Sequence, residues 1–540
     1  MTSSGTMALR NSWDDPKDSA AIPSFASLLF LNEQNWSEID SRKEPECFRD
    51  LNLDQVIEST VARRDEYNLK PFFYCGPQDP ATVSYRQEIF RDLETKTVAD
   101  SVRSFALAMR TVYRYLETVE KLFYRRQKQR WFVEAVDTYC RGVRDLANEL
   151  QTSGLQSTGL QSLRVYLESY TKSEAFCALE PGAQGLVAHL NDIRYSLHIE
   201  GKRIVVAPYE EGVDYGTEVL RVFEKFRQEA SKDYHFNLRS DADMNHVEAA
   251  ILDMVAQLYP EIFSSIEEYC TRYRDFLSTT IVRVDREFQF YLAWHAYMQR
   301  FARAGLSFCY PGVSAESKEI AAQDAFDLAL ADNLVRHNRS VVTNDFFLAG
   351  PERTIVVSGP NQGGKTTFAR MFGQLHYLAS LGCPVPAKRA QLFLCDRLFT
   401  HFEKEENLHN LSGKLEDELL RIRRIFEAAT SNSILIMNES FLSTTLQDAV
   451  FLSKQVMQRI IELDMLCVSV TFIDELASLG PTVVSMVSTV NPDNPVLRTF
   501  RVVRRPADGL AYAAAIAEKY ELTYEQVKAR ITGNVAEGSA

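Results

Sequence analysis

Several features are scarce in this sequence, and each absence excludes a class of protein. The nine cysteines contain no C-x-x-C pair, which argues against a zinc ribbon or a disulfide framework and for reduced thiols. No uninterrupted apolar run approaches the ~20 residues needed to span a bilayer, and no signal-like apolar segment opens the chain. The sequence therefore predicts a soluble, cytoplasmic protein with no membrane partner.

Basic residues are also fewer than acidic residues. The 60 Lys and Arg residues face 73 Asp and Glu residues, so the net charge is −13 and the pI is near 5.4. Proteins that bind nucleic acid are often basic. Any contact with nucleic acid must therefore be confined to a local basic region.

Length and composition predict several packed domains. A chain of 540 residues is expected to hold about three domains. A hydrophobic content of 45% and an aromatic content of 11% are sufficient for packed cores. We expect an N-terminal tail and small cap over residues 1–80, a helical domain over residues 81–330 and an α/β domain over residues 331–540.

The middle of the chain has a helical pattern. No Pro or Gly occurs between Val83 and Gly142, and apolar residues recur three or four apart up to residue 150 and again over 247–304. This pattern predicts long helices. One interruption, at 195–206, alternates on both sides of Gly201 and predicts a β-hairpin.

A basic and aromatic run, Lys121–Phe132, lies within the helical part and has two interpretations. Its five cations and four aromatic residues could contact a phosphate backbone. The commoner arrangement is a solvated helix face whose aromatic residues point inward.

The clearest chemical motif lies in the C-terminal part. A glycine-rich stretch fits the phosphate-loop pattern G-x-x-x-x-G-K-[ST] and comprises Gly359, Pro360, Asn361, Gln362, Gly363, Gly364, Lys365, Thr366 and Thr367. An apolar, β-branched segment over 354–358 precedes it, and a helical pattern follows until Gly382. Strand, loop and helix are the context that this motif requires, so a chance match is the weaker interpretation.

The loop predicts a site for ATP. Glycines let several backbone N–H groups face one anion, and the following helix adds the positive end of its dipole. Lys365 would reach the β- and γ-phosphates, and the Thr366 hydroxyl would bind Mg²⁺.

A second motif, 434–439, is an apolar strand that ends in Asn438 and Glu439. An acid pair at this position usually places one carboxylate near Mg²⁺ and another beside the attacking water. Glu439 fits the catalytic position, whereas Asn438 offers the metal a neutral amide, so weaker Mg²⁺ binding is expected. A buried strand with a surface Glu at its end is the alternative.

Strands and helices alternate from the loop to about residue 531. The expected elements are strands at 434–437, 466–471, 483–487 and 497–503, a helix near 446–462 and a final helix. Such alternation predicts a mostly parallel sheet with helices on its faces. The fold class is thus α and α/β, multidomain.

These motifs resemble the ATPase domain of the MutS family of DNA mismatch repair proteins. The family's G-P-N-M-G-G-K-S-T corresponds to residues 359–367, its N-D step to Asn344-Asp345, its G-x-x-V-P-A to 382–387 and its D-R-I-F-T to 396–400. The segment from Ser412 to Glu418 is similar to its S-T-F-M-x-E, with one extra residue. The resemblance implies a P-loop NTPase domain of the ABC type over 340–531.

The helical middle is similar, more loosely, to the family's core, lever and clamp. Nothing in the chain resembles the family's N-terminal mismatch-recognition and connector domains, and we expect both to be missing. The resemblance further implies a homodimer that closes on DNA, double-stranded, mismatched or branched, and signals to a downstream protein of unknown identity.

The departures from the family's pattern concern hydrolysis. The family's D-E-I-G-R-G-T-S-T is replaced by residues 438–446, which lack its glycines, although Ser443, Thr444 and Thr445 retain hydroxyls that could reach a phosphate. The histidine of T-H-Y-H-E-L is replaced by Phe472. ATP binding is therefore expected, with hydrolysis to ADP and phosphate that is weakened by Asn438 and Phe472.

Three functions are compatible with these features. The first is a divergent MutS-type ATPase that closes on DNA as a nucleotide-dependent dimeric clamp. The second is a nucleotide-dependent protein-interaction ATPase that has lost mismatch repair. The third is another P-loop enzyme, such as a small-molecule kinase, which has no use for the long helices.

Overall fold

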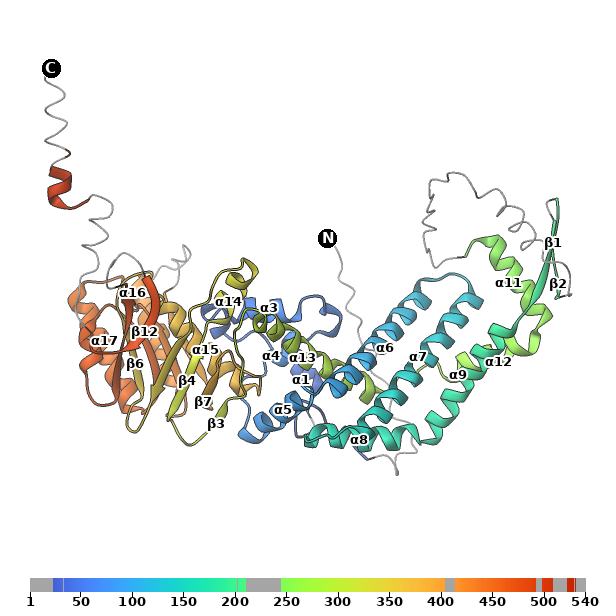
Figure 1. The fold of residues 1–540 in the computed structure, drawn as a ribbon, viewed down its shortest axis with the longest axis horizontal. Coiled ribbons are helices and arrows are strands. Elements are labelled where there is room, and N and C mark those ends of the chain that lie inside the picture. Colours follow the sequence, from blue (N-terminus) through green and yellow to red (C-terminus); the bar gives the residue numbers. More distant parts are fainter. Residues whose placement is uncertain are drawn as a thin grey trace, which may run out of the picture.

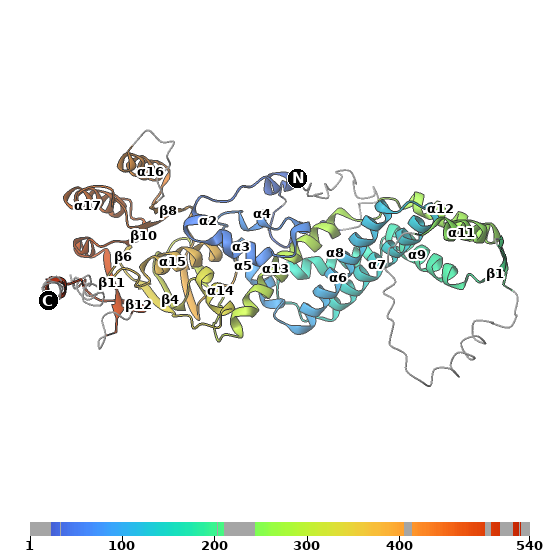
Figure 2. The same cartoon turned by 90° about the horizontal axis from the view of Figure 1, so that it is seen from above.

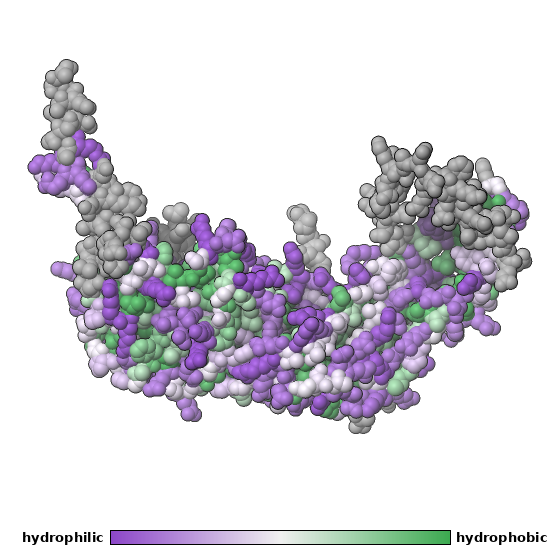
Figure 3. Space-filling model, in the orientation of Figure 1, coloured by the Kyte–Doolittle hydropathy of each residue, from purple (hydrophilic) through white to green (hydrophobic). Residues whose placement is uncertain are grey.

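The protein is an elongated molecule with an α/β part at one end and a helical arm at the other (Figure 1). The computed structural model describes residues 23–32, 34–201, 203–209, 244–403, 413–491, 498–507, 522–528 and 530. Among these residues, no helix combines the length and the apolar composition needed to cross a bilayer. On the face seen in Figure 3, hydrophilic residues cover most of the arm.

The N-terminal segment consists of short helices that pack where the arm meets the α/β part. They are α1 (Trp36–Asp40), α2 (Cys47–Asp50), α3 (Leu53–Val61), η1 (Asp65–Tyr67) and α4 (Lys70–Phe73). The core extends through all three regions, because one cluster of buried apolar residues includes Phe48, Phe290 and Phe372.

The arm is built from long helices, as the sequence predicted. They are α5 (Pro80–Asp92), α6 (Lys96–Lys121), α7 (Arg125–Thr152), α8 (Thr158–Thr171), α9 (Glu174–Asp192), α11 (His246–Leu258), α12 (Pro260–Arg272) and α13 (Thr279–Ala302). The expected hairpin is confirmed and consists of β1 (Tyr195–Glu200) and β2 (Arg203–Pro208), which are antiparallel.

The helical pattern over 83–150 is interrupted twice, at 93–95 and 122–124. Neither break contains Pro or Gly, so tertiary contacts stabilise the turns. Near the first break, the Asp92 carboxylate accepts hydrogen bonds from the N–H and the hydroxyl of Ser157, at 2.8 and 2.6 Å. At the second, Leu122 is buried between the ends of α6 and α7.

The α/β part contains two sheets. Its elements are β3 (Gly312–Ser314), β4 (Ile320–Ala325), α14 (Leu328–Arg336), β5 (Asn344–Leu348), β6 (Thr354–Ser358), α15 (Lys365–Ser380), β7 (Arg389–Phe393), β8 (Leu398–Phe402), α16 (Lys414–Ala428), β9 (Ile434–Asn438), α17 (Leu446–Glu462), β10 (Leu466–Val470), η2 (Asp474–Ser478), β11 (Val483–Val490) and β12 (Arg498–Arg504). The predicted strands and the helix over 446–462 are confirmed. The expected final helix lies mostly outside the described residues.

The larger sheet has the order β12-β11-β6-β10-β9-β8 and is parallel except for β12. Figure 2 shows α16 and α17 on one side of this sheet and α15 on the other. Alternate side chains of β6 pack on opposite faces of the sheet. Ile355 and Val357 belong to the main core, whereas Val356 belongs to the cluster under α17. Burial on both faces is typical of parallel sheets.

The smaller sheet has the order β3-β7-β4-β5 and was not foreseen from the sequence. It affects where the α/β part begins. The boundary expected at 330/331 falls inside α14, and β4, which precedes α14, pairs with β5 and β7. Residues from about 312 onward are therefore integrated into the α/β part.

Candidate nucleotide site

The glycine-rich loop joins the buried strand β6 to helix α15. Gly359 and Gly364 have φ values of +112° and +93°, in the region that favours glycine. Gly364 is also the N-cap of α15, so the helix begins at Lys365. The backbone thus curls at the carboxyl end of a central parallel strand, where ligands bind in sheets of this kind.

The loop is seated on the neighbouring strand β11. The Ser488 hydroxyl donates a 2.6 Å hydrogen bond to the carbonyl of Gly363. A Cβ on Gly363 would lie 2.3 Å from Ser488 Oγ, and one on Gly359 would lie 2.8 Å from Ser488 O. Both glycines are therefore required by close packing. No motif identifies Ser488 in the sequence.

Lys365 lies in the centre of the loop and is only 4% exposed. Its ammonium group donates hydrogen bonds to the carbonyls of Gly359 and Pro360, at 3.0 and 3.1 Å, and to Asn361 Oδ1 at 3.2 Å. Burial lowers the pKa of Lys365, while nearby Glu439 opposes that shift. The arrangement supplies a cation that can exchange loop carbonyls for phosphate oxygens.

The end of β9 lies beside the same loop. The Thr366 hydroxyl donates to Asn438 Oδ1 at 2.8 Å, and a Glu439 carboxylate oxygen lies 3.9 Å from Lys365 Nζ. The bond to Asn438 engages the hydroxyl proton and leaves the Thr366 oxygen lone pairs for another ligand. The pair therefore fits Mg²⁺, although with neutral donors only.

Glu439 is held by its backbone. Its φ is +50°, and its N–H donates to the carbonyl of Val470 on β10 at 2.9 Å. Because β10 lies between β9 and β6, this contact fixes the carboxylate at the sheet edge that carries the loop. The structure thus brings together Lys365, Thr366, Asn438 and Glu439, four of the predicted site residues.

The segment after Glu439 does not join this group. Ser443 is exposed, and among the described residues it makes no hydrogen bond to the loop. Thr445 is the N-cap of α17, where its side chain bonds Asp448. The Thr445 hydroxyl is thus engaged in capping, contrary to the expectation that it is available to a phosphate. Phe472, in place of histidine, is 47% exposed.

Glu418 positions this segment. The buried Glu418 carboxylate accepts a 3.0 Å hydrogen bond from the N–H of Phe441, whose φ is +63°, and burial raises the pKa of Glu418. The other end of the predicted motif, Ser412, lies outside the described residues.

The remaining family-like motifs make structural contacts. Asn344 Oδ1 accepts from the N–H of Val502 at 2.7 Å, which fastens β12. The Pro384 carbonyl accepts from Trp294 of α13 at 3.2 Å, and Thr400 donates to Asp50 at 2.6 Å. These motifs therefore connect the sheets to the arm and to the N-terminal segment.

The basic run at Lys121–Phe132 forms the turn between α6 and α7. Arg125 forms an ion pair with Glu267, Arg130 pairs with Glu134, and Arg126 lies 5.2 Å from the centre of the Phe263 ring. Internal pairing of these arginines favours the interpretation as a solvated helix face, but the expectation that its aromatic residues point inward is wrong for Phe123, which is 81% exposed.

The arrangement defines a class of α/β protein in which a parallel sheet presents a glycine loop, a buried lysine and a strand-end carboxylate at one edge. Comparison with known proteins is more specific, since residues 355–528 match the model of MutS domain V. The C-terminal part of the chain is thus similar to domain V of the MutS family.

The relatives are DNA mismatch repair proteins. The chain is 31% identical over 129 residues to the DNA mismatch repair protein MSH3 of Eremothecium gossypii, and this match covers 24% of the chain and 12% of the relative. It is 29% identical over 168 residues to MSH4 of Arabidopsis thaliana, covering 31% and 20%. It is 25% identical over 235 residues to MutS of Thermotoga maritima, covering 43% and 28%. The matched regions thus cover between 12% and 28% of the length of these relatives.

Proposed function

We propose that the chain binds ATP with Mg²⁺ at the glycine loop and acts as a nucleotide-dependent homodimeric clamp on DNA, in a role related to mismatch repair. The observation that carries the proposal is the meeting of Lys365, Thr366, Asn438 and Glu439 at one sheet edge. The match of residues 355–528 to MutS domain V and the long helical arm support the DNA-binding part.

Each residue has a separate task in this proposal. Lys365 neutralises the charge of the phosphates, and backbone N–H groups of the loop and of α15 orient the phosphates. Thr366 and Asn438 hold the metal and its water shell. Glu439 accepts a proton from the attacking water. Bound MgATP supplies a transferable phosphoryl group.

Turnover is expected to be slow. Asn438 adds no charge at the metal, Phe472 replaces a histidine, and Thr445 caps α17. The proposal therefore assigns the clamp's opening and closing mainly to nucleotide binding and release. Glu439→Gln should abolish the residual hydrolysis and leave ATP binding intact.

The test measures DNA affinity in each nucleotide state. Fluorescence anisotropy with duplex, mismatched and branched DNA, with and without ATP, should reveal an ATP-dependent change in affinity. Sedimentation in parallel should show that ATP promotes a dimer. ATP binding without DNA binding would contradict the clamp and favour the nucleotide-dependent interaction protein. No ATP binding would refute the proposal.

A further inference from the structure

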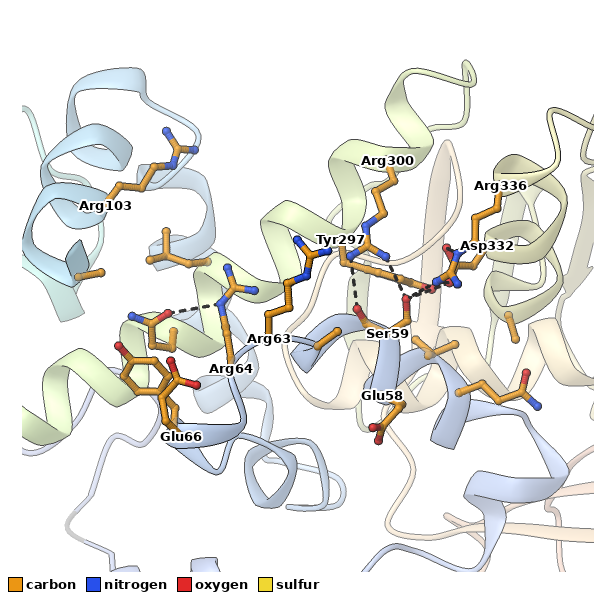
Figure 4. A pocket seen from close by; sticks show the side chains of 18 of the residues that line it. Glu58, Ser59, Arg63, Arg64, Glu66, Arg103, Tyr297, Arg300, Asp332 and Arg336 are labelled. Carbon is orange, nitrogen blue, oxygen red and sulfur yellow. Dashed lines mark hydrogen bonds and ion pairs between the residues drawn. The ribbon is translucent and has the colours of Figure 1, made fainter. Parts of the chain in front are cut away.

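A cavity of about 1140 Å³ lies at the root of the arm and contains no residue of the glycine loop. The N-terminal helix α3 and the turn after it, together with α6, α13 and α14, form its walls. Six arginines line it: Arg63, Arg64, Arg103, Arg110, Arg300 and Arg336. Figure 4 shows the labelled ones spread across the cavity, from Arg103 through Arg64 and Arg63 to Arg300 and Arg336.

The positive charge of the lining is only partly neutralised, and one arginine, Arg103, pairs with Asp100 outside the lining at 2.8 Å. The three carboxylates that line the cavity are already in ion pairs, Glu58 with Lys70, Glu66 with Arg110 at 3.5 Å, and Asp332 with Arg336 at 2.5 Å. Six arginines against three carboxylates leave the lining at +3 in a chain of net charge −13.

Three of the arginines have no carboxylate partner within the described part of the chain. Arg63 is exposed and makes no hydrogen bond or ion pair there. Arg64 donates only to Gln289 Oε1, at 3.4 Å, and Arg300 donates to Ser59 and lies over the Tyr297 ring. Burial lowers the pKa of Arg64; Tyr67 and Glu66 oppose this shift, whereas the neighbouring Arg110 and Arg300 add to it. Like charges are thus crowded on this wall.

Two tyrosine hydroxyls in the lining also lack partners. Tyr67 is 8% exposed and Tyr297 is fully buried, and in the described structure neither hydroxyl has a hydrogen-bond partner. A buried hydroxyl without a partner costs roughly 1–3 kcal/mol. An anionic ligand would supply acceptors to the guanidinium groups.

We propose that this cavity binds consecutive phosphates of a nucleic-acid backbone. Guanidinium groups match phosphate oxygens in a bidentate geometry. Arg103 and Arg110 are seven residues apart on α6, about 10 Å along one face, and the other arginines continue the row across the cavity. A single phosphate ester would engage only one end of this row, whereas a polymer engages its whole length.

The inference rests on the proposed DNA binding and adds a second contact to it. DNA held by the arm is also held at the arm's root, beside the α/β part. Because α14 lines the cavity and packs against α15, this contact places the backbone near the helix that carries Lys365.

The test uses the full chain with Arg63, Arg103 and Arg110 each changed to Gln. All three side chains are substantially exposed, so the substitutions should leave the fold intact. A control variant, Arg389→Gln with Arg423→Gln and Arg459→Gln, removes the same charge from exposed positions of the α/β part, outside the cavity and the arm. Anisotropy with a labelled duplex is measured over a series of salt concentrations.

The cavity variant should lose at least about tenfold in affinity, and the slope of log K against log salt should fall by about 3, since each lost phosphate contact contributes about 0.9. The control should stay within about twofold of the parent. Equal losses in both variants, with ATP-dependent DNA binding retained in the parent, would overturn the cavity site alone. Absence of DNA affinity in every nucleotide state would overturn the proposed function as well.

A second measurement needs no substitution. Phenylglyoxal modifies accessible arginines, and mass spectrometry identifies the sites. Duplex DNA should protect Arg63 and leave Arg389 reactive. Equal reactivity of Arg63 with and without DNA would overturn the site. The site would also be overturned if the cavity variant lost affinity for inorganic tripolyphosphate but kept its affinity for DNA, because the occupant would then be a soluble polyphosphate.

Discussion

Lys365 is the only residue of the loop that supplies a full charge, and its surroundings determine what it can bind. Its ammonium group has three oxygen partners from the loop and lies near Glu439. The partners keep a buried cation stable until an anion arrives. Replacement of these neutral acceptors by phosphate oxygens would produce stronger, charge-assisted hydrogen bonds.

Lys365→Ala should therefore reduce ATP affinity by at least about 100-fold, because hydrogen bonds to charged groups contribute roughly 1.5–3 kcal/mol each. Calorimetric titration with ATP measures the change. Lys172→Ala, which removes the exposed lysine directly after α8, serves as the control and should bind like the parent. Retained affinity in Lys365→Ala would show that the nucleotide binds elsewhere.

Asn438 determines the metal affinity in our proposal. Asn438→Asp keeps an oxygen that can accept from Thr366 and adds a charge next to the metal, so the apparent Mg²⁺ affinity in the presence of ATP should rise by about tenfold or more. A Mg²⁺ titration of nucleotide binding measures it. Asn432→Asp makes the same chemical change at an exposed turn and should have no effect. An unchanged titration in Asn438→Asp would remove this residue from the metal site.

The candidate site was partly predictable at this scale. The residues of the loop could be identified because their function depends on backbone curvature, which glycines at fixed spacing impose. Ser488 and Glu418 could not be identified, because each acts through one contact with a residue far away in the chain. The arginine cavity escaped prediction for the same reason, since its arginines come from residues 63 to 336.

Among the elements, α6 and α7 pack closely at Gly142. A Cβ at this glycine would lie 2.7 Å from the Cβ of Ala108, whereas one at Gly185 of α9 would meet nothing within 4 Å. Both glycines lie inside helices, where Ala is intrinsically better by roughly 1 kcal/mol. The two positions therefore separate helix propensity from packing.

Gly185→Ala should stabilise the protein by about 0.5–1 kcal/mol. Gly142→Ala should destabilise it by up to about 2 kcal/mol, because crowding of roughly 1–3 kcal/mol outweighs the gain in propensity. The midpoints of urea unfolding, followed by circular dichroism, measure both. If the two variants shift the midpoint equally, α6 and α7 do not pack closely at this position.

Long and regular elements could be predicted from the sequence, whereas the short strands of the smaller sheet could not. The helix over 446–462 and the long arm helices were predicted because many residues repeat one period. The sheet β3-β7-β4-β5 was missed because its strands have three to six residues and are drawn from positions 312 to 393. Pairing of such short segments is decided by tertiary contacts and leaves no periodic signal.

Helix α13 carries a buried carboxylate that attaches the N-terminal segment. Glu287 accepts hydrogen bonds from the Ser27 hydroxyl and the Leu28 N–H. Burial raises the pKa of Glu287 to about 7. The unfolded chain loses this proton from about pH 4.5 and the folded chain only near pH 7, so the group lowers stability progressively as the pH rises through that window.

Glu287→Gln removes the titrating charge and keeps a similar shape. The difference between the unfolding free energies of variant and parent should be close to zero near pH 4.5. Above pH 7 the variant should be more stable by about 3 kcal/mol. Urea unfolding of both proteins over this range measures the difference, in which the other titrating groups cancel. Glu416→Gln, at an exposed position, should show no pH-dependent difference. A flat difference for Glu287→Gln would mean that the carboxylate is solvated.

At the scale of the whole molecule, one side chain joins the glycine loop's helix to the root of the arm. Gln374 of α15 is fully buried. Its Oε1 accepts from the N–H of Leu328 at 2.7 Å, and its Nε2 donates to the carbonyl of Leu51 at 2.8 Å. Leu328 begins α14, and Leu51 precedes α3 by two residues. Both helices line the arginine cavity.

This contact offers a physical route by which nucleotide at the loop changes the arm. A ligand alters a distant element only if both share a structure whose arrangement each ligand biases. Here α15 begins at the loop, and its Gln374 contacts the first residue of α14 and the residue two positions before α3. ATP should therefore slow backbone hydrogen exchange at residues 53–61 and 328–336.

Gln374→Met removes both hydrogen bonds at nearly constant volume. It should cost about 2–4 kcal/mol of stability, since two buried backbone groups lose their partners, and it should abolish the ATP-dependent slowing at 53–61 and 328–336 while ATP still binds. Hydrogen–deuterium exchange with mass spectrometry measures this. Gly142→Ala, which weakens the protein elsewhere, should keep the response, because the path through Gln374 is intact. If Gln374→Met responds to ATP like the parent, coupling between the loop and the arm runs through other contacts.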